Sequence, residues 1–354
     1  MRAIPTAYVV ENSILGENLY NSSGNILVKK GTTLTAKLLK QIEVNKVYTL
    51  YIDDPHSDYE VFRLLEQSLR VKGALLMKEL FALANEHKSI LDVHNRLESY
   101  VNDVLYELKS FKRKTIEHID IKNVDNYIYS SSINVALLSA LIAWDLNYSD
   151  DMVKQIFIGA LYHDIGIALL PSDVINKSGE LSIDEKMMIL NHPNKGHNYL
   201  KDKTFLSAYV KQIALHHHEC LDGSGYPNRI KDDDISFISQ IVGVADIYDA
   251  MTSDRPYKRA VPPYEALEYI LGTGSKFDPK VINAFIKRIT PYPCGSIVKL
   301  SNGKFAVVDE ISEDVPLRPI VRIINKVGDG YEYQRIDLRV NNSIVIENIS
   351  YDKI

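Results

Sequence analysis

Residues 216–227 have the sequence His-His-His-Glu-Cys-Leu-Asp-Gly-Ser-Gly-Tyr-Pro, and the interpretation of the rest of the chain depends on them. Three consecutive histidines rarely lack a function. Imidazole binds Zn, Fe, Ni and similar ions well, whereas carboxylates suit harder ions such as Mn. Gly223 and Gly225 permit tight turns and a close approach of the backbone to a ligand. The stretch therefore predicts a metal-binding turn followed by a glycine-rich loop.

Two further histidines lie upstream, each at a predicted helix boundary. His163 and Asp164 follow the apolar run DDMVKQIFIGAL, and Gly166 behind them is predicted to be the C′ residue that ends this helix. A carboxylate beside an imidazole can share one cation with it, or bridge two cations. His192 precedes Pro193, which suits the first turn of a new helix. Taken singly these histidines are typical of caps or surface residues, but together with the first stretch they indicate a shared site.

A pair of aspartates forms the last group. Asp246 and Asp249 are three residues apart on an apolar segment, so they share one face of a predicted helix. Removing a carboxylate from water is costly unless a cation or hydrogen bonds compensate. Arg255 and Lys258 follow where this helix is expected to end, and arginine can bind phosphate through two parallel hydrogen bonds. The four groups together predict metal and phosphate chemistry.

In this order the motifs HD, HP, HHE-x-x-DGSGYP, D-x-x-D and RPYK resemble the HD-GYP family of HD-superfamily phosphohydrolases. The resemblance covers about residues 120–288. It implies an all-helical domain with a di- or trinuclear iron or manganese centre that hydrolyses cyclic di-GMP to linear pGpG or GMP. Segments at residues 15–35 and 292–308 resemble modules that often accompany this domain.

The resemblance also implies a role for each matching residue. Metal ligands are expected at His163, Asp164, His192, His217, His218 and Asp246, with Asp164 bridging two ions and with His163, Asp164 and Asp246 at the catalytic centre. Contacts to the dinucleotide are expected from Arg255, Lys258, Gly225, Tyr226 and Pro227. Asp249 is expected to orient a ligand. Glu219 is expected either to orient a metal-bound histidine or to make a structural hydrogen bond.

Two positions depart from the family pattern. Ser131 stands where the family has a histidine ligand, and a neutral hydroxyl binds metal far more weakly than imidazole does. Ile167 stands where the family has a lysine beside the metals. Losing one group that stabilises developing charge costs about 10²–10³ in rate. The expected centre holds two divalent transition-metal ions, Fe or Mn. Its first site, which would keep only His163, Asp164 and Asp246 as protein ligands, is therefore expected to bind metal more weakly.

These departures leave two functions open. The first is a metal-dependent phosphodiesterase that hydrolyses cyclic di-GMP with reduced activity. The second is a catalytically degenerate receptor that binds cyclic di-GMP and signals through its flanking modules. The six retained ligands and the intact Gly-Tyr-Pro motif favour the first function, whereas Ser131 and Ile167 favour the second.

The fold class is predicted to be mainly α, with an all-helical HD-type domain between small β-rich modules. The expected divisions are a β-rich module at 1–54, a helical connector at 55–112, the HD-GYP-type domain at 113–289 and a small β module at 290–354. The connector has apolar residues at three- and four-residue steps, which predicts two long helices with a break near 85–89. Such stripes need a partner surface, which either the central domain or a second copy of the chain can supply; the second alternative predicts a homodimer through these helices.

Patterns in the flanking modules predict several elements. The segment TLTAKLLKQI predicts a short helix with Thr33 or Thr35 as N-cap, and KVYTLYI predicts a strand. The segment CGSIVKLSNGKFAVVDEI predicts a hairpin with its turn at Asn302-Gly303. Strands are also expected in PIVRIINK and NSIVIENI.

Net charge and composition argue against nucleic-acid and membrane partners. The formal net charge of −5 supplies no basic field for binding DNA or RNA. Cys220 and Cys294 suggest no disulfide framework, which is typical of a cytoplasmic protein. The apolar run at 133–144 is shorter than the roughly 20 residues that span a bilayer, so it predicts a buried helix and no membrane partner.

Overall fold

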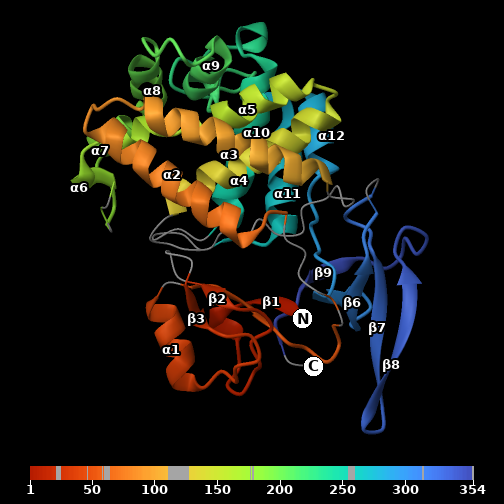
Figure 1. Ribbon diagram of the computed structural model, residues 1–354. Helices are drawn as coiled ribbons and strands as arrows, with labels where there is room; N and C mark the ends of the chain where they lie inside the picture. Colours follow the sequence, from red (N-terminus) through yellow and green to blue (C-terminus); the bar gives the residue numbers. More distant parts are fainter. Residues whose placement is uncertain are drawn as a thin grey trace.

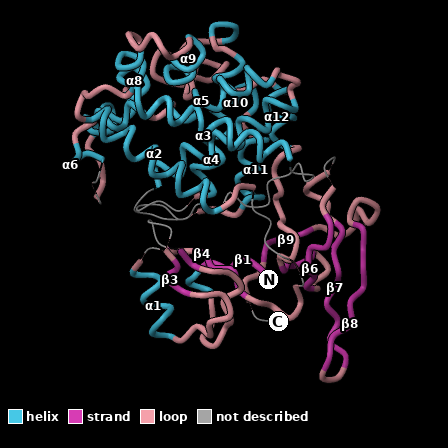
Figure 2. The backbone as a smooth tube through the Cα atoms, in the orientation of Figure 1, coloured by secondary structure: helices cyan, strands magenta, loops and turns pink. Residues whose placement is uncertain are grey.

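The computed structural model describes residues 1–20, 25–45, 47–57, 59, 64–110, 127–175, 177, 179–253, 260–312 and 315–352. Helices α2 to α12 gather in one half of the molecule and the strands lie in the other, together with α1 (Figure 1). Figure 2 shows the same division between helical and β-rich parts. The predicted fold class, a mainly helical protein with β-rich flanking modules, is therefore confirmed.

The predicted connector forms two long helices, α2 (Gln67–Asn85) and α3 (Leu91–Ser110), and the break near 85–89 is confirmed. Their apolar stripes pack against α4 (Tyr127–Asp145) and α5 (Asp150–Tyr162) within one hydrophobic cluster. The stripes are thus covered inside the chain and give no argument for a dimer. The homodimer itself stays a prediction.

Helices α4 and α5 lie at the centre of the helical domain. The predicted apolar helix is buried from Ile133 to Ala143. The windows Ile128–Asp145 and Asp150–Leu169 are long and apolar enough, by length and composition, to cross a membrane, and 78% and 61% of these windows are buried within the protein. A helix that is apolar on all sides needs a core or a membrane around it, and here neighbouring helices supply the core.

Serine side chains start several of the helices that surround this centre. Ser149, Ser182, Ser207 and Ser236 each accept a hydrogen bond from the backbone N–H three residues on, which satisfies one of the free donors of the first turn. The remaining helices are α6 (Ser172–Ile175), α7 (Ile183–Leu190), α8 (His192–Leu200), α9 (Ala208–His216), α10 (Phe237–Thr252), α11 (Pro263–Leu271) and α12 (Pro279–Ile286). Short 3-10 helices are η1 (Thr6–Tyr8), η3 (Ile165–Leu169), η4 (Asp232–Asp234) and η5 (Gly274–Lys276).

The N-terminal module combines two small sheets with one helix. Thr35 caps the predicted helix, and the strand predicted in KVYTLYI pairs antiparallel with a strand that the sequence did not reveal, because that strand is short and ends in proline. Two further short strands, at residues 19–20 and 26–28, also pair antiparallel. The elements are β1 (Arg2–Pro5), β2 (Leu19–Tyr20), β3 (Ile26–Val28), α1 (Ala36–Val44) and β4 (Thr49–Ile52).

The C-terminal module is one antiparallel sheet with the strand order β8-β7-β6-β5-β9. The predicted hairpin is confirmed: Ile297 pairs with Val307, and Gly303 adopts a φ of 80° in the turn. The sequence did not predict β8, whose mostly exposed polar residues carry no buried pattern. The strands are β5 (Ile297–Leu300), β6 (Phe305–Glu310), β7 (Ile320–Val327), β8 (Gly330–Asp337) and β9 (Ile346–Ile349).

Buried polar contacts join the two β-rich modules. The Arg2 guanidinium lies 2.7 Å from Asp54 Oδ2 and donates to the carbonyl oxygens of Ser350 at 3.0 Å and Asp352 at 2.8 Å. Tyr59 donates to Asp309 Oδ1 at 2.7 Å. The first strand therefore lies beside residues 350–352, near the other end of the described chain. Figure 1 shows the first strand in the β-rich half of the molecule.

Candidate metal centre

Four segments of the helical domain bring the six predicted ligands together. His163 ends α5 and Asp164 begins the turn into η3. His192 is the first residue of α8, with proline behind it as predicted. His217 and His218 directly follow α9, and Asp246 lies in α10. Residues that are distant along the chain thus meet at the ends and faces of packed helices.

The donor atoms of these residues form one cluster. Asp164, His192, His217 and His218 each offer one ligand atom, and these four atoms lie within 4.8 Å of one another. His163 Nε2 lies 3.4 Å from Asp164 Oδ2 and 3.8 Å from Asp246 Oδ1. His218 Nδ1 lies 3.7 Å from Asp246 Oδ2.

Asp164 lies between two groups of histidines. Its Oδ1 is 3.0 Å from His192 Nε2 and 3.8 Å from His217 Nε2, whereas its Oδ2 faces His163. The two oxygens of one carboxylate therefore point to different nitrogen donors. This is the geometry that a carboxylate needs in order to contact two cations at once.

Backbone carbonyls fix the orientation of three imidazoles. In each ring Nδ1 lies within hydrogen-bond distance of a carbonyl oxygen, at 2.6 Å for His163, 2.8 Å for His192 and 3.1 Å for His217. A carbonyl can only accept, so Nδ1 carries a proton, and in the neutral ring Nε2 keeps a lone pair. Such a contact fixes the tautomer of metal-binding histidines. The carbonyls belong to Ala160, Ile189 and Ile213.

The resulting lone pairs have no protein donor to satisfy them. His192 Nε2 and His217 Nε2 are 3.3 Å apart, although neither carries a proton in this tautomer. His163 Nε2 is buried and makes no well-directed hydrogen bond within the described ranges. A cation between these atoms would satisfy the three nitrogens. The residues present therefore fit a metal ion of the kind that binds imidazole and carboxylate.

Burial and neighbouring charges set the ionisation of the cluster. Burial lowers the pKa of His217 and holds the pKa of His218 well below its usual value, so both rings stay neutral. Burial opposes ionisation of Asp164, but His163 outweighs it and lowers the pKa of that carboxyl. The same carboxylate, together with Asp246, raises the pKa of His163 against burial. A metal that binds at His163 must therefore displace a proton.

Gly166 allows the two halves of the cluster to meet. A Cβ atom at this position would lie 2.0 Å from the carbonyl oxygen of His192 and 2.8 Å from Gly196 N, distances that no side chain tolerates. Gly166 is not the C′ residue of α5, because the chain continues from His163 directly into η3. The prediction of a helix C-cap was wrong, and close approach between η3 and α8 explains the glycine instead.

The Gly-Tyr-Pro loop folds back over the cluster. The Tyr226 ring stacks on the His218 ring, with centroids 4.4 Å apart and planes inclined by 29°. The carboxylate of Glu219 accepts hydrogen bonds from the backbone N–H groups of Asn228 at 2.6 Å and Arg229 at 3.1 Å. These contacts are structural hydrogen bonds, one of the two roles that the sequence left open for Glu219, and the orientation of a metal-bound histidine stays a prediction.

Asp249 lies on the same face of α10 as Asp246, as predicted, and is 2% exposed. Its oxygens accept hydrogen bonds from Ser131 Oγ at 2.6 Å, Asn134 Nδ2 at 2.8 Å and Ser253 Oγ at 3.1 Å. The sequence did not identify Asn134 and Ser253 as partners. A signal was present for Asn134, because an amide inside an apolar helix needs a buried hydrogen-bond partner.

Three further positions that the sequence singled out are Ile167, Arg255 and Lys258. Ile167 is half-buried in η3, where its backbone N–H donates to the carbonyl oxygen of Asp164 at 2.9 Å. Arg255 and Lys258 belong to residues 254–259, which lie outside the described residues. Their predicted contacts to phosphate therefore stay predictions.

The helical domain therefore contains a cluster of imidazoles and carboxylates that could hold metal ions. The family model for the HD domain matches residues 100–281, and the model for a KOW domain associated with the HD domain matches residues 297–352. The chain belongs to the HD domain family, whose members depend on metal ions.

Several characterised proteins are similar to this chain. A cyclic di-GMP phosphodiesterase of Pseudomonas aeruginosa is 37% identical over 205 residues, which are 58% of this chain and 50% of that protein. A cyclic di-GMP phosphodiesterase response regulator of Xanthomonas campestris is 30% identical over 234 residues, which are 65% of this chain and 61% of the relative. The chain thus spans about half to three fifths of the length of these relatives.

A solved structure shares the fold. An HDG"Y"P protein from Bdellovibrio bacteriovorus is 17% identical, with a TM-score of 0.50 over 80% of this chain and 97% of that one. At this level of identity the likeness concerns the arrangement of elements alone.

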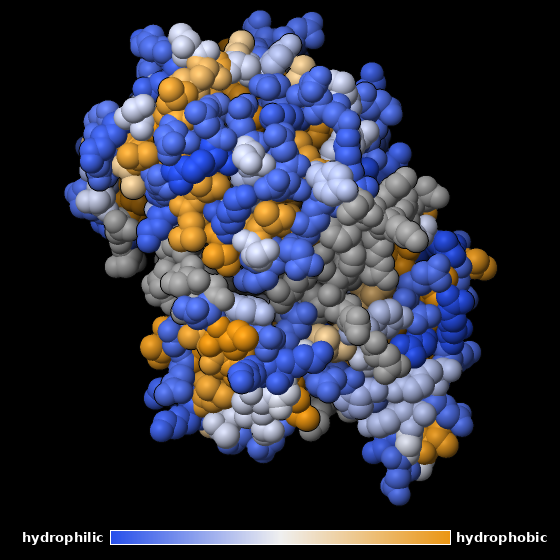
Figure 3. Space-filling model, in the orientation of Figure 1, coloured by the Kyte–Doolittle hydropathy of each residue, from blue (hydrophilic) through white to orange (hydrophobic). Residues whose placement is uncertain are grey.

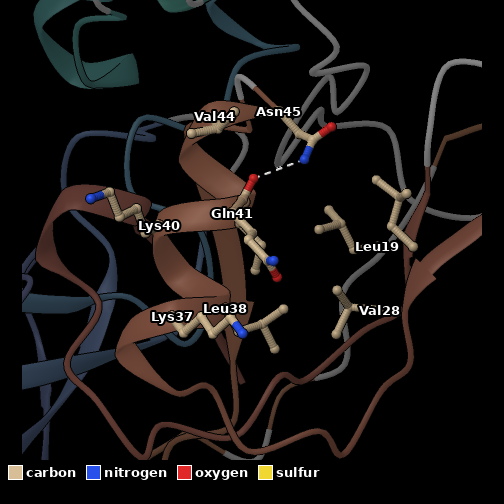
Figure 4. Close-up of a pocket in the computed structure, with 10 residues that line it drawn as sticks. Leu19, Val28, Lys37, Leu38, Lys40, Gln41, Val44 and Asn45 are labelled. Carbon is tan, nitrogen blue, oxygen red and sulfur yellow. Dashed lines mark hydrogen bonds between the residues drawn. The ribbon is translucent and has the colours of Figure 1, made fainter.

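A cavity of about 510 Å³ lies in the N-terminal module, away from the histidine cluster. It opens between α1 and the β2–β3 hairpin, where Leu19 and Val28 face Leu38 and Gln41 across the gap (Figure 4). Apolar residues gather on this part of the surface in Figure 3. None of the residues that line it belongs to the predicted site.

Proposed function

We propose that this protein is a metal-dependent phosphodiesterase that hydrolyses cyclic di-GMP to pGpG or GMP, with activity reduced by Ser131 and Ile167. The observation that carries the proposal is the convergence of His163, His192 and His217 with their Nε2 lone pairs directed into one buried cluster. The similarity to two cyclic di-GMP phosphodiesterases supports the choice of substrate.

The residues of the chain would bind and orient the reacting groups. Bound divalent metal ions would supply Lewis acidity and lower the pKa of water at the phosphodiester. Asp164, through its two oxygens, would bridge the sites that His192 and His217 form on one side and His163 on the other. Asp246 lies beside both His163 and His218, so it would hold the first site. Helix packing keeps these groups in place before substrate binds, which lowers the entropic cost of the reaction.

The choice of metal follows from the donor set. Four imidazoles and two carboxylates combine borderline ligands with hard ligands, which suits iron or manganese better than calcium or magnesium. We therefore propose a dinuclear Fe or Mn centre, with its first site weakened because Ser131 binds Asp249 instead of offering an imidazole.

A receptor is the second candidate function, and Ile167 favours it. The half-buried isoleucine occupies the turn beside Asp164 and cannot donate a proton or offset developing charge. A protein that retains the metal cluster but lacks this cation could bind cyclic di-GMP without cleaving it. The flanking β-rich modules would then carry the signal.

Hydrolysis by the metal-loaded protein distinguishes the two functions. The full chain is reconstituted with Fe(II) or Mn(II) under anaerobic conditions and incubated with cyclic di-GMP. Formation of pGpG or GMP above a His217→Ala, His218→Ala variant supports the phosphodiesterase. No product above that variant excludes it, and titration calorimetry with cyclic di-GMP then tests the receptor. Absence of binding at tens of micromolar, equivalent to about −6 kcal/mol, would exclude the receptor as well.

We propose that the protein is cytoplasmic. Cys220 and Cys294 are free thiols, which a reducing compartment preserves. The net charge of −5 supports a small dinucleotide as ligand over duplex DNA or RNA.

A further inference from the structure

The Gly-Tyr-Pro loop reaches the metal cluster through a backbone contact with His218 and through ring contacts of Tyr226 with His218 and His192. Tyr226 N donates to the carbonyl oxygen of His218 at 3.1 Å, and the Tyr226 ring stacks on the imidazole of the same residue. Gly225 makes this approach possible, because a Cβ atom there would lie 2.4 Å from Cys220 N and 2.5 Å from His218 O. The loop thus forms one wall around a predicted metal ligand.

A buried carboxylate binds the backbone at the far end of the loop, at Asn228 and Arg229. Glu219 is 1% exposed, and its Oε1 accepts the backbone N–H groups of both Asn228 and Arg229. Arg229 has a φ of 55°, a left-handed conformation that is unfavourable for a residue with a side chain. Such a conformation persists only where surrounding contacts hold it. The two hydrogen bonds to Glu219 supply such contacts.

Glu219 also directly follows His218 in the chain. The residue that anchors the loop, Glu219, is therefore the neighbour of His218, whose imidazole the loop covers. Tyr226 lies between Glu219 and the anchored residues Asn228 and Arg229. Tyr226 lies only two residues before Asn228, so the stacked ring and the anchored backbone belong to one short segment.

We propose that Glu219 is a positioning residue for the metal centre: by holding the backbone at Asn228 and Arg229, it keeps the Tyr226 ring stacked on His218 and so fixes the orientation of that imidazole. The proposal deepens the proposed function, since it takes His218 to be a metal ligand. Glu219 acts through Tyr226 and contacts neither metal nor substrate. Removing a residue that orients a ligand typically lowers metal affinity about 10–100-fold.

To hold the loop, Glu219 needs an oxygen that accepts the two backbone N–H groups, and it does not need a negative charge. A Glu219→Gln variant keeps an amide oxygen that can accept both N–H groups, whereas Glu219→Ala removes the acceptor. Glu107→Ala is the matched control, because Glu107 also accepts a backbone hydrogen bond, from Glu66 N at 2.8 Å, but on α3 and outside the cluster.

Hydrogen exchange of the metal-free protein tests the anchor itself. We expect faster exchange in the peptide that contains Asn228 and Arg229 for Glu219→Ala, and exchange like wild type for Glu219→Gln and Glu107→Ala. Unchanged exchange in Glu219→Ala would overturn the proposal, because the carboxylate would then not hold the loop.

Titration with Co(II), followed by its visible absorption, tests the effect on the metal centre. We expect Glu219→Ala to weaken Co(II) binding about 10–100-fold and Glu219→Gln to remain within about threefold of wild type. Equal losses in Glu219→Ala and Glu219→Gln would show that charge matters rather than the loop, and would overturn the proposal. Wild-type affinity in Glu219→Ala would overturn it too.

A double variant tests whether Glu219 acts through Tyr226. If it does, Tyr226→Leu weakens Co(II) binding by itself, and adding Glu219→Ala weakens it little further, because coupled residues are not additive. Fully additive losses would contradict the mechanism. None of these measurements uses cyclic di-GMP, so they stand even if the protein neither hydrolyses nor binds it.

Discussion

Ser131 Oγ lies 2.6 Å from Asp249 Oδ2 and joins α4 to α10 by a hydrogen bond between two buried side chains. Asn134, almost one turn further along α4, donates to the other oxygen of the same carboxylate. The position at which the HD-GYP family has a metal-binding histidine therefore binds a second carboxylate of α10 in this chain. The serine that departs from the family pattern thus has a hydrogen-bond partner of its own.

Replacing Ser131 with alanine should destabilise the helical domain. The Ser131→Ala variant leaves the buried Asp249 carboxylate without one of its donors, which should cost about 1–3 kcal/mol. Urea denaturation measures the change in the free energy of unfolding. Ser132→Ala is the matched control: its hydroxyl donates only to the carbonyl oxygen of Ile128 at 3.2 Å, so its loss should cost about 1 kcal/mol or less. Equal losses in the two variants would contradict the importance of Asp249.

Restoring both family residues should raise turnover. The Ser131→His, Ile167→Lys variant adds an imidazole beside α10 and a cation beside Asp164, and recovering one charge-stabilising group is worth about 10²–10³ in rate. The measurement is the initial rate of cyclic di-GMP hydrolysis with Mn(II). Ile167→Met controls for a change of shape without charge. A restored variant no faster than this control would show that neither departure limits catalysis.

A methyl group at Gly166 should separate the two halves of the cluster. Gly166→Ala would place its Cβ 2.0 Å from the carbonyl oxygen of His192, so η3 and α8 must move apart. We expect loss of Mn(II) affinity by at least about tenfold, measured by calorimetry, because His192 is then displaced from Asp164. At Gly179 a Cβ would meet no atom within 4 Å, so Gly179→Ala should bind metal as wild type does.

Metal ions should stabilise the folded protein. They bind the assembled cluster and not the unfolded chain, so a metal concentration of about 100 times Kd should add about 2.7 kcal/mol to the free energy of unfolding. Thermal unfolding in Mn(II) and in chelator gives the shift in Tm. The His217→Ala, His218→Ala variant should lose the shift. A shift that persists in this variant would mean that the metal binds elsewhere.

Replacing Arg2 should be costly. Arg2→Met removes the donor to Ser350 and Asp352 of the C-terminal module. Within the N-terminal module it leaves Asp54, whose side chain is 9% exposed, without its cation, and removing one partner of a buried pair costs about 3–5 kcal/mol. Lys72→Met is the control, because the Lys72–Asp103 pair is about half exposed and should contribute at most about 1 kcal/mol. The two variants are compared by urea denaturation, and similar small losses would show that the modules do not depend on Arg2.

The sequence predicted elements wherever local chemistry determines them. The break between α2 and α3, the N-cap at Thr35 and the Asn302-Gly303 hairpin follow from short-range patterns, and all three are present. The four groups of histidines and aspartates also occur together, as their chemistry requires.

Features that depend on tertiary contacts were not predictable in this way. Gly166 was taken for a helix cap because its close contact with His192 comes from another helix. The partners of Asp249 include Asn134, which is 115 residues away in the chain. The apolar stripes of α2 and α3 have the same pattern whether they face a second copy or the same chain, and only the fold shows that α4 and α5 cover them.

The hydrogen bond from Arg2 to Ser350 spans 348 positions of the chain, with the whole helical domain in between. Domains generally fold as units during synthesis, the N-terminal ones first. The helical domain can therefore assemble on the ribosome while Arg2 still lacks two of its acceptors. The contacts of Arg2 can be completed only after residues near 350 have been made. Removing these residues is therefore expected to destabilise the N-terminal module.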